Sequence, residues 1–157
     1  MNKIRMLFAT ALIGCLSAGA AQAGGCPADK IVPDGMGQKM SDAPAQGVTD
    51  TVISSNDLAQ QGIGVNDRLF RLRRLVVQPG GVVPWHSHAD RPAIIYIISG
   101  QITEFASTCA VPIVHKAGEA TPEMHGTAHW WRNDGKQPVE LLSADLFHKT
   151  KPDDHMM

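Results

Sequence analysis

From Leu69 to Phe147 the sequence is a succession of short apolar runs separated by turns that contain glycine. Runs rich in valine, isoleucine and leucine are typical of β-strands, and scarcely any stretch carries the period of a helix. Many short strands joined by tight turns fold into a closed barrel or a double-sheet jelly roll. The pattern predicts an all-β domain, with strands at 69–77, 82–88, 93–98, 102–106, 111–116, 129–132 and 139–147.

Turn chemistry predicts how several of these strands end. Pro-Gly-Gly at 79–81 is expected to end the first strand, because proline has no N–H to donate to a central ladder. Ser-Gly-Gln at 99–101 predicts a tight hairpin, and Asp-Gly at 134–135 supplies the positive-φ positions of a type I′ hairpin. The run 93–98 is apolar throughout, which predicts a strand covered on both faces.

The first residues have the features of an export signal. Two basic residues precede an apolar run at 6–16, and Ala-Gln-Ala at 21–23 matches a signal-peptidase site. We therefore expect a signal peptide over residues 1–23, cleaved after Ala23, and a periplasmic or secreted protein. No later apolar run approaches the roughly 20 residues of a transmembrane helix, so no transmembrane segment is expected.

A lipoprotein anchored through Cys15 is the competing hypothesis, because residues 12–15 resemble a lipobox. We favour soluble export, since the apolar run before Cys15 is short and the Ala-Gln-Ala site would go unused.

The rest of the chain is large enough for one domain and too short for two. Residues 24–62 are expected to form an extended N-terminal arm, a short strand at 48–53 and a turn. Residues 63–149 are then the barrel, and 150–157 a mobile tail. The formal net charge of −1, without large basic clusters, argues against a nucleic-acid partner.

Two cysteines, Cys26 and Cys109, remain after cleavage. In an exported domain a disulfide between them is plausible and would pin the arm to the barrel. The alternative is two unpaired thiols that lie too far apart to bridge.

Three histidines carry the spacing of a metal site. His86 and His88 lie two residues apart on one expected strand, so both side chains project to the same side. His129 lies on another expected strand, just after a glycine-containing turn. Three imidazoles are a common ligand set for transition metals and leave coordination positions open. No Walker-type glycine loop or Cys-x-x-Cys motif is present.

These stretches resemble the two motifs of the cupin superfamily. Four residues fall on the first motif, G-x5-H-x-H-x(3,4)-E-x6-G, and four on the second, G-x5-P-x-G-x2-H-x3-N: Gly80, His86, His88, Gly100, Gly118, Gly126, His129 and Asn133. The resemblance implies a small antiparallel barrel, with the metal inside it, that is commonly a homodimer.

The chain departs from the family pattern at two positions. Met124 replaces a proline, and Ala93 stands where the first motif has its glutamate ligand. Without that carboxylate we expect a neutral three-histidine site that holds a divalent Fe, Zn, Ni or Cu ion, rather than Mn or Mg. Asp90, Glu123 and His125 are candidate replacement ligands, but for each we favour a solvated loop residue.

Strand alternation also predicts the walls of a pocket. Ile95 shares the face of Ala93, and Trp131 that of His129, while His125 is placed at the mouth. Such walls fit a small, partly apolar organic ligand, although core packing explains these residues equally well.

Several functions are compatible with this pattern. Some cupins with a bare three-histidine site are oxygenases, among them the thiol dioxygenases, so one hypothesis is an oxygen-using or other metal-dependent enzyme acting on a small organic substrate. The second is a non-catalytic module of the periplasm that binds a metal or small ligand, and the third is a purely structural barrel.

Overall fold

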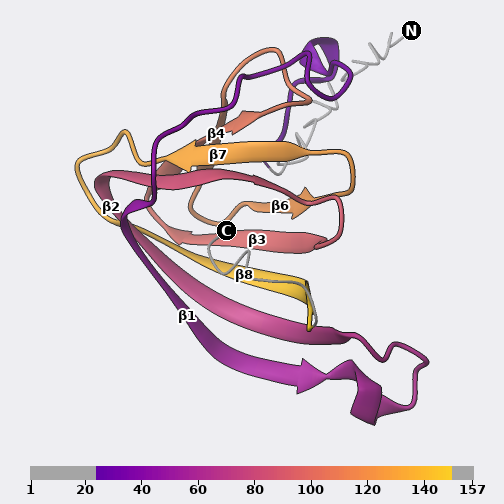
Figure 1. Ribbon diagram of the computed structural model, residues 1–157. Coiled ribbons are helices and arrows are strands. Elements are labelled where there is room, and N and C mark those ends of the chain that lie inside the picture. Colours follow the sequence, from indigo (N-terminus) through magenta and orange to yellow (C-terminus); the bar gives the residue numbers. More distant parts are fainter. Residues whose placement is uncertain (1–23, 150–157) are drawn as a thin grey trace, which may run out of the picture.

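The computed structural model describes residues 24–149, and in these the chain forms one curled antiparallel sheet (Figure 1). The expected signal peptide and tail lie outside the described residues. The sheet has the strand order β5-β4-β7-β2-β8-β3-β6. The eighth strand, β1, lies outside this order and pairs with β2. The elements are η1 (Ala28–Lys30), β1 (Gln46–Asp57), η2 (Leu58–Gln61), β2 (Arg68–Ser87), β3 (Ala93–Ser99), β4 (Gln101–Ala106), β5 (Ile113–Lys116), β6 (Ala120–Glu123), β7 (Ala128–Arg132) and β8 (Val139–His148).

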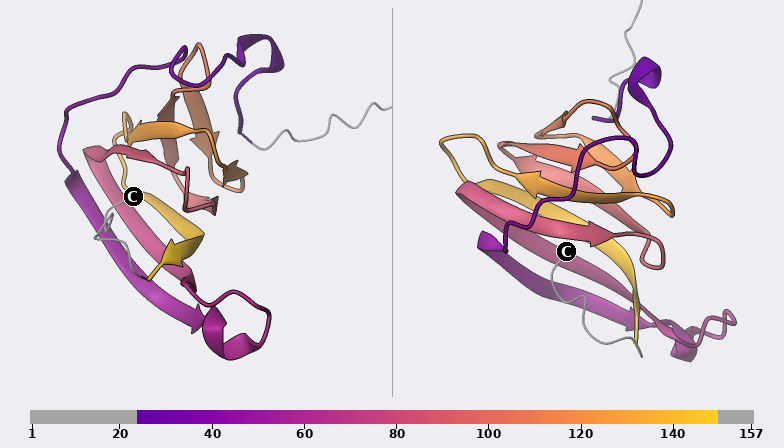
Figure 2. Two further views of the ribbon diagram at one scale, coloured as in Figure 1. Left: turned by 45° about the vertical axis from the view of Figure 1, so that its right-hand side comes forward. Right: turned by 45° about the horizontal axis from the view of Figure 1, so that its top comes forward.

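The oblique views show how strongly the sheet curls (Figure 2), and the interior of the curl is apolar. Successive residues of a strand face opposite sides, so alternate residues of β2, β3 and β8 enter the core. The buried apolar cluster consists of Leu75, Val77, Val83, Ile95, Ile97, Ile102, Trp131, Val139 and Leu141. The expected all-β antiparallel barrel is therefore confirmed.

β2 does not end at the Pro-Gly-Gly of 79–81, so that prediction is wrong. The strand runs on to Ser87 and changes partners instead: residues 69–77 lie between β1 and β8, whereas 82–87 pair with β7. Residues 78–81 lie between the two ladders, where Gly80 and Gly81 exchange backbone hydrogen bonds with Asn133 and the missing N–H of Pro79 breaks no bond of either ladder. Gly80 adopts a φ of 74°, which lets the strand bend there.

Both predicted hairpins are also wrong. β3 and β4 follow each other in sequence, but β3 pairs with β6 and β8, and β4 with β5 and β7. The Asp-Gly hairpin does not form either, because β2 lies between β7 and β8 in the sheet. Neither Asp134 nor Gly135 has the positive φ that a type I′ turn requires. Asn133 shapes this connection instead, because its side-chain amide donates to the carbonyls of Val77 and Gln137.

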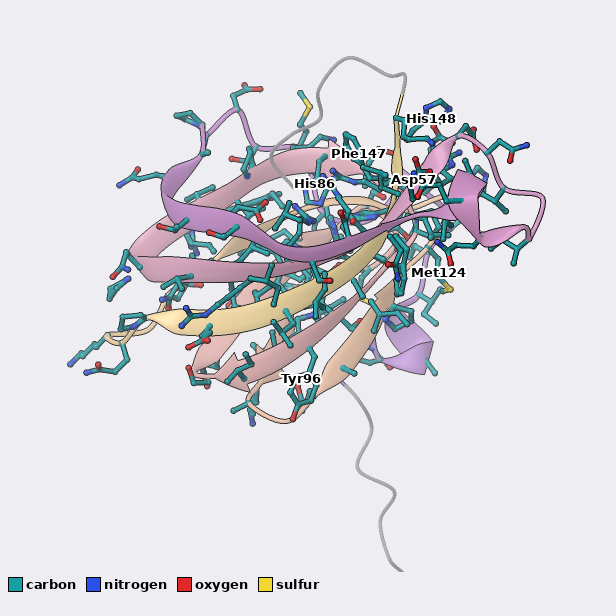
Figure 3. All side chains as sticks on the ribbon, turned by 90° about the horizontal axis from the view of Figure 1, so that it is seen from below. Asp57, His86, Tyr96, Met124, Phe147 and His148 are labelled. Atoms are coloured by element: carbon teal, nitrogen blue, oxygen red, sulfur yellow. A yellow bond between two sulfur atoms is a disulfide. The ribbon has the colours of Figure 1, made fainter. Side chains whose placement is uncertain are left out.

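β3 is covered on one face only, contrary to expectation. Ile94, Tyr96 and Ile98 are 58%, 45% and 41% exposed, while the residues between them are buried. Figure 3 shows Tyr96 directed away from the sheet. The uninterrupted apolar run therefore reflects one core face and one apolar outer face.

The N-terminal arm is attached by the expected disulfide between Cys26 and Cys109, whose Cα atoms lie 5.7 Å apart. An isolated β-bridge joins Ile31 to Cys109, and the Gly37 amide donates to the carbonyl of Ser107. The arm is thus held against the connection between β4 and β5. In residues 24–149 no helix has the length and hydropathy needed to cross a membrane.

Candidate metal centre

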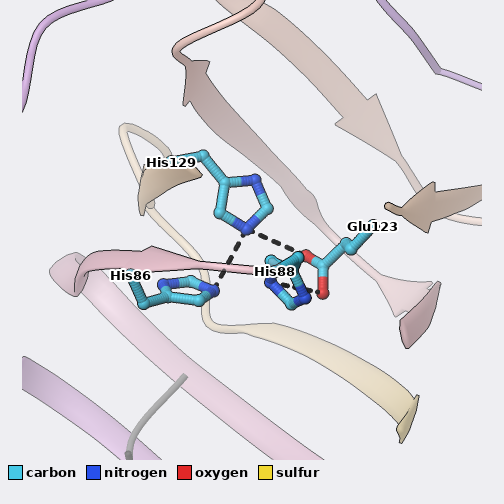
Figure 4. A group of neighbouring side chains, drawn as sticks. All are labelled: His86, His88, Glu123 and His129. Atoms are coloured by element: carbon cyan, nitrogen blue, oxygen red, sulfur yellow. Dashed lines mark hydrogen bonds and ion pairs between the residues drawn. The ribbon is translucent and has the colours of Figure 1, made fainter. Parts of the chain in front are cut away.

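The structure brings the three predicted ligands together. His86 and His129 are direct cross-strand partners on β2 and β7, and His88 follows just after β2 ends. The centroids of the three imidazole rings lie 4.6–4.9 Å apart, and all three side chains are buried. Figure 4 shows the rings converging on one point.

Glu123 is the fourth member of this group. Its carboxylate lies 3.2 Å from Nε2 of His88 and 3.3 Å from Nε2 of His129, and the four donor atoms are all within 4.8 Å of one another. The interpretation of Glu123 as a solvated loop residue is wrong: it is 3% exposed and ends β6. The potential donor set is three histidines and one carboxylate.

Glu123 lies directly beside the position where the first motif has its glutamate. Ala93 on β3 is the direct cross-strand partner of Glu123 on β6. Cross-strand partners project to the same face, so the carboxylate enters the interior from the neighbouring strand. Ala93 itself is buried, as expected.

Hydrogen bonds to the outer nitrogens orient all three rings. Nδ1 of His86 contacts the carbonyl of Pro84 at 2.9 Å, and Nδ1 of His88 contacts that of Arg91 at 2.6 Å. Nδ1 of His129 lies 2.5 Å from a carboxylate oxygen of Glu104. Carbonyl and carboxylate oxygens only accept, so each Nδ1 carries the proton and each Nε2 faces the centre of the group.

These inward atoms fit a cation. Nε2 of His88 and both carboxylate oxygens of Glu123 are buried without a hydrogen-bond partner, and Nε2 of His86 lies 3.1 Å from Nε2 of His129. The indole N–H of Trp131, 3.5 Å from Nε2 of His129, is the donor that the structure places beside these atoms. Buried lone pairs that face one another in this way are unfavourable unless a cation binds between them. Imidazole nitrogen and carboxylate oxygen are ordinary ligands of divalent transition metals.

Burial and nearby charges set the protonation of the group. Burial lowers the pKa of His86 well below its usual value and that of His88 to about 3, so both are neutral at neutral pH. Burial raises the pKa of Glu123 to about 7. For His129, burial opposes the charge, but the carboxylates of Glu123 and Glu104 outweigh it and raise the pKa.

The other predicted pocket residues lie at different depths. Ile95 is fully buried in the core, and the indole N–H of Trp131 lies 3.5 Å from Nε2 of His129. His125 is exposed and accompanies His88 in lining a surface pocket of about 360 Å³. Asp90, a candidate ligand, is outside the cluster and pairs with Arg68 at 2.7 Å.

Buried charges also line the interior, and sequence reasoning missed their role. Arg71 and Arg73 alternate inward on β2, and both contact Asp145 of β8. Arg73 also pairs with Asp50 of β1 at 2.6 Å. The expected aliphatic and aromatic walls therefore enclose only part of the interior. The sequence signal that could have indicated this is the presence of arginines at alternate positions, 71 and 73, of a predicted apolar strand.

Comparison with known proteins assigns the central part of the chain to a family. The model for the Cupin domain matches residues 73–145. A germin-like protein of Arabidopsis thaliana (subfamily 2 member 2) is 31% identical over 84 residues, which cover 52% of this chain and 38% of that protein. An auxin-binding protein of Prunus persica is 26% identical over 140 residues, which cover 73% and 64%. The chain thus spans less than two thirds of either relative.

Solved structures share the fold. A structure from Thermotoga maritima, described as a predicted oxalate decarboxylase, has a TM-score of 0.54 at 20% identity and covers 78% of this chain and 97% of that one. An oxalate oxidase in complex with glycolate has a TM-score of 0.50 at 20% identity, covering 73% and 58%. Residues 73–145, which match the Cupin domain model and contain both histidine motifs, are therefore a cupin domain.

Proposed function

We propose that the chain is a metal-dependent enzyme that binds one divalent transition metal through its three histidines and Glu123 and acts on a small organic substrate. One observation carries the proposal: three imidazoles, each fixed through Nδ1, direct Nε2 toward a buried carboxylate that has no hydrogen-bond partner. Ligands held in this way need little reorganisation to bind an ion.

The residues around the site define its access route and its walls. A bound ion would supply Lewis acidity or a redox couple for oxygen or substrate. Substrate would enter by the pocket that His88 and His125 line, and Ile95 and Trp131 would form apolar walls behind the ligands. The preference for Fe, Zn, Ni or Cu over Mn rested on the absence of a carboxylate; with Glu123 in the donor set, Mn becomes a further candidate.

Elemental analysis of the protein purified from its native host tests the metal. We expect about one transition-metal ion per chain, and a large loss in a His86→Ala variant, since one of four ligands is removed. A His148→Ala variant is the matched control, because His148 ends β8 and pairs with Asp67 outside the cluster. Equal metal content in the two variants would overturn the assignment.

Turnover is tested on the metal-loaded protein. Oxygen uptake and product formation would be followed with thiols, diketones, phenols and small carboxylic acids, the last group because the structural neighbours include an oxalate oxidase with bound glycolate. Metal-dependent product that is absent in His86→Ala supports the enzyme. Absence of turnover across the panel would count against it.

A non-catalytic binding module is the second candidate, favoured by the similarity to an auxin-binding protein. In that case an aromatic carboxylic acid would bind the metal-loaded protein in calorimetry, and mass spectrometry would recover it unchanged.

We also propose export and self-association. The Cys26–Cys109 disulfide fits an oxidising compartment, which supports cleavage of residues 1–23 and a periplasmic or secreted location. Mass spectrometry of the intact protein tests the location. A mass that corresponds to a chain starting at Gly24 would support soluble export, whereas a chain that starts at a lipid-modified Cys15 would support a membrane-anchored lipoprotein. The apolar outer face of β3 supports a homodimer.

A further inference from the structure

Two buried polar residues beside the metal centre have no place in the four-donor set. Glu104 lies on β4 and is 6% exposed, and His115 lies on β5 and is fully buried. The two strands pair with each other, and β4 also pairs with β7, which carries His129. The three side chains therefore form a row across three adjacent strands.

Glu104 is the middle member of this row. One carboxylate oxygen lies 2.5 Å from Nδ1 of His129, and the other lies 2.7 Å from Nε2 of His115. A carboxylate only accepts, so both histidines donate to it. The carboxylate can then neither rotate nor turn away from His129 without losing a buried hydrogen bond to His115.

Packing holds His115 in turn. Its ring stacks on the indole of Trp131 with centroids 4.7 Å apart, and Trp131 also contacts His129. On the outer side a Cβ atom at Gly24 would lie 2.8 Å from Nδ1 of His115, so the N-terminal arm closes over this end of the row. The disulfide at Cys26, two residues further on, holds the arm there.

We propose that Glu104 and His115 are positioning residues for the metal centre: Glu104 fixes the ring of His129 with Nε2 inward, and His115 fixes Glu104. This inference rests on the proposed metal binding. It assigns a role to two residues that touch neither metal nor substrate, and it makes the arm the outer cover of the pair.

Metal affinity and the spectrum of the bound metal test the pair. The Kd for Zn²⁺ and the visible bands of bound Co²⁺ would be measured for Glu104→Gln, His115→Phe and His115→Gln. Loss of an outer partner of a metal-bound histidine weakens binding by about 10- to 100-fold. We expect such a loss, with shifted Co²⁺ bands, in Glu104→Gln and His115→Phe.

The choice of variants separates positioning from packing. His115→Phe keeps a ring on Trp131 but has no donor for Glu104, whereas His115→Gln retains an N–H and should recover most of the affinity. Glu140→Gln is the matched control, since Glu140 pairs with Arg74 on the outer side and should bind as the parent does. A Kd for His115→Phe within about twofold of the parent would overturn the inference while leaving metal binding intact.

A second measurement tests the pair without bound metal. If the parent protein binds no metal, the proposed function fails, and the pair is judged by the nitrogen-bound proton on Nδ1 of His129 in nuclear magnetic resonance. Slow exchange of this proton in the parent, and its loss from the spectrum in His115→Phe, would support positioning. Equally slow exchange in both would reject it.

Discussion

Ala93 and Glu123 place the potential carboxylate donor on a different strand from the one that the first motif predicts. The two residues are cross-strand partners on β3 and β6, both face inward, and only Glu123 bears a carboxylate. The first motif lacks its glutamate at Ala93, and the buried carboxylate of the group lies instead just before the Met124 of the second motif.

Exchanging the two side chains tests this relation. We expect Glu123→Ala to weaken Zn²⁺ binding by about 100-fold or more, because a charged ligand is lost. Adding Ala93→Glu to that variant should recover at least about tenfold of the loss, since the new carboxylate projects to the same face. Calorimetric titration gives both values, and Ala93→Gln in the same background is the uncharged control. Equal affinity for the Glu and Gln double variants would contradict the exchange.

The sequence predicts some of these residues better than others. The spacing of His86 and His88, and the second motif around His129, are sufficient to bring the three histidines together. Glu123 is missed because β6 consists of Ala-Thr-Pro-Glu, which has low strand propensity and contains a proline. The proline is tolerated because β6 ends the strand order and Pro122 is exposed. Only the structure shows that Thr121 and Glu123 alternate inward on this strand.

At the level of elements, strand positions are predicted well and strand partners poorly. The runs near 93–98, 102–106, 129–132 and 139–147 all form strands within a few residues of the expected bounds. Both hairpins fail because turn residues describe only the local path of the chain, whereas the sheet order places β7, β2 and β8 between β4 and β3. In the second connection, the side chain of Asn133 provides contacts that no local turn pattern indicates.

The disulfide of the N-terminal arm is expected to stabilise the fold. It joins residues 83 positions apart, so breaking it frees a long loop in the unfolded chain. Cys26→Ser with Cys109→Ser should lower the free energy of unfolding by about 2–5 kcal/mol. Denaturant titration of the oxidised parent and the double variant measures this. The reduced parent should match the double variant, and an unchanged midpoint on reduction would show that the disulfide contributes nothing to stability.

For the whole molecule, the outer face of the sheet is the least explained surface. Ile94 and Tyr96 of β3 pair with Ala144 and Leu142 of β8, and Ala144 pairs in turn with Leu72 of β2. Partners in register share a face, so these apolar residues form a continuous strip on the outside of the curl. An exposed apolar strip of this kind marks an interaction surface, and the proposed homodimer is the occupant that we test.

A lysine in the middle of the strip should separate the two chains. Tyr96 is 45% exposed, and Tyr96→Lys would remove apolar contact area and bring a charge into the interface. A loss of roughly 2 kcal/mol corresponds to an association more than tenfold weaker. Sedimentation equilibrium should give the mass of two chains for the parent and a mass closer to that of one chain for Tyr96→Lys.

Val114→Lys is the matched control, because Val114 is similarly exposed at 44% but lies on β5, at the opposite end of the strand order. Equal dissociation in both variants would place the contact elsewhere, and a monomeric parent would exclude the homodimer.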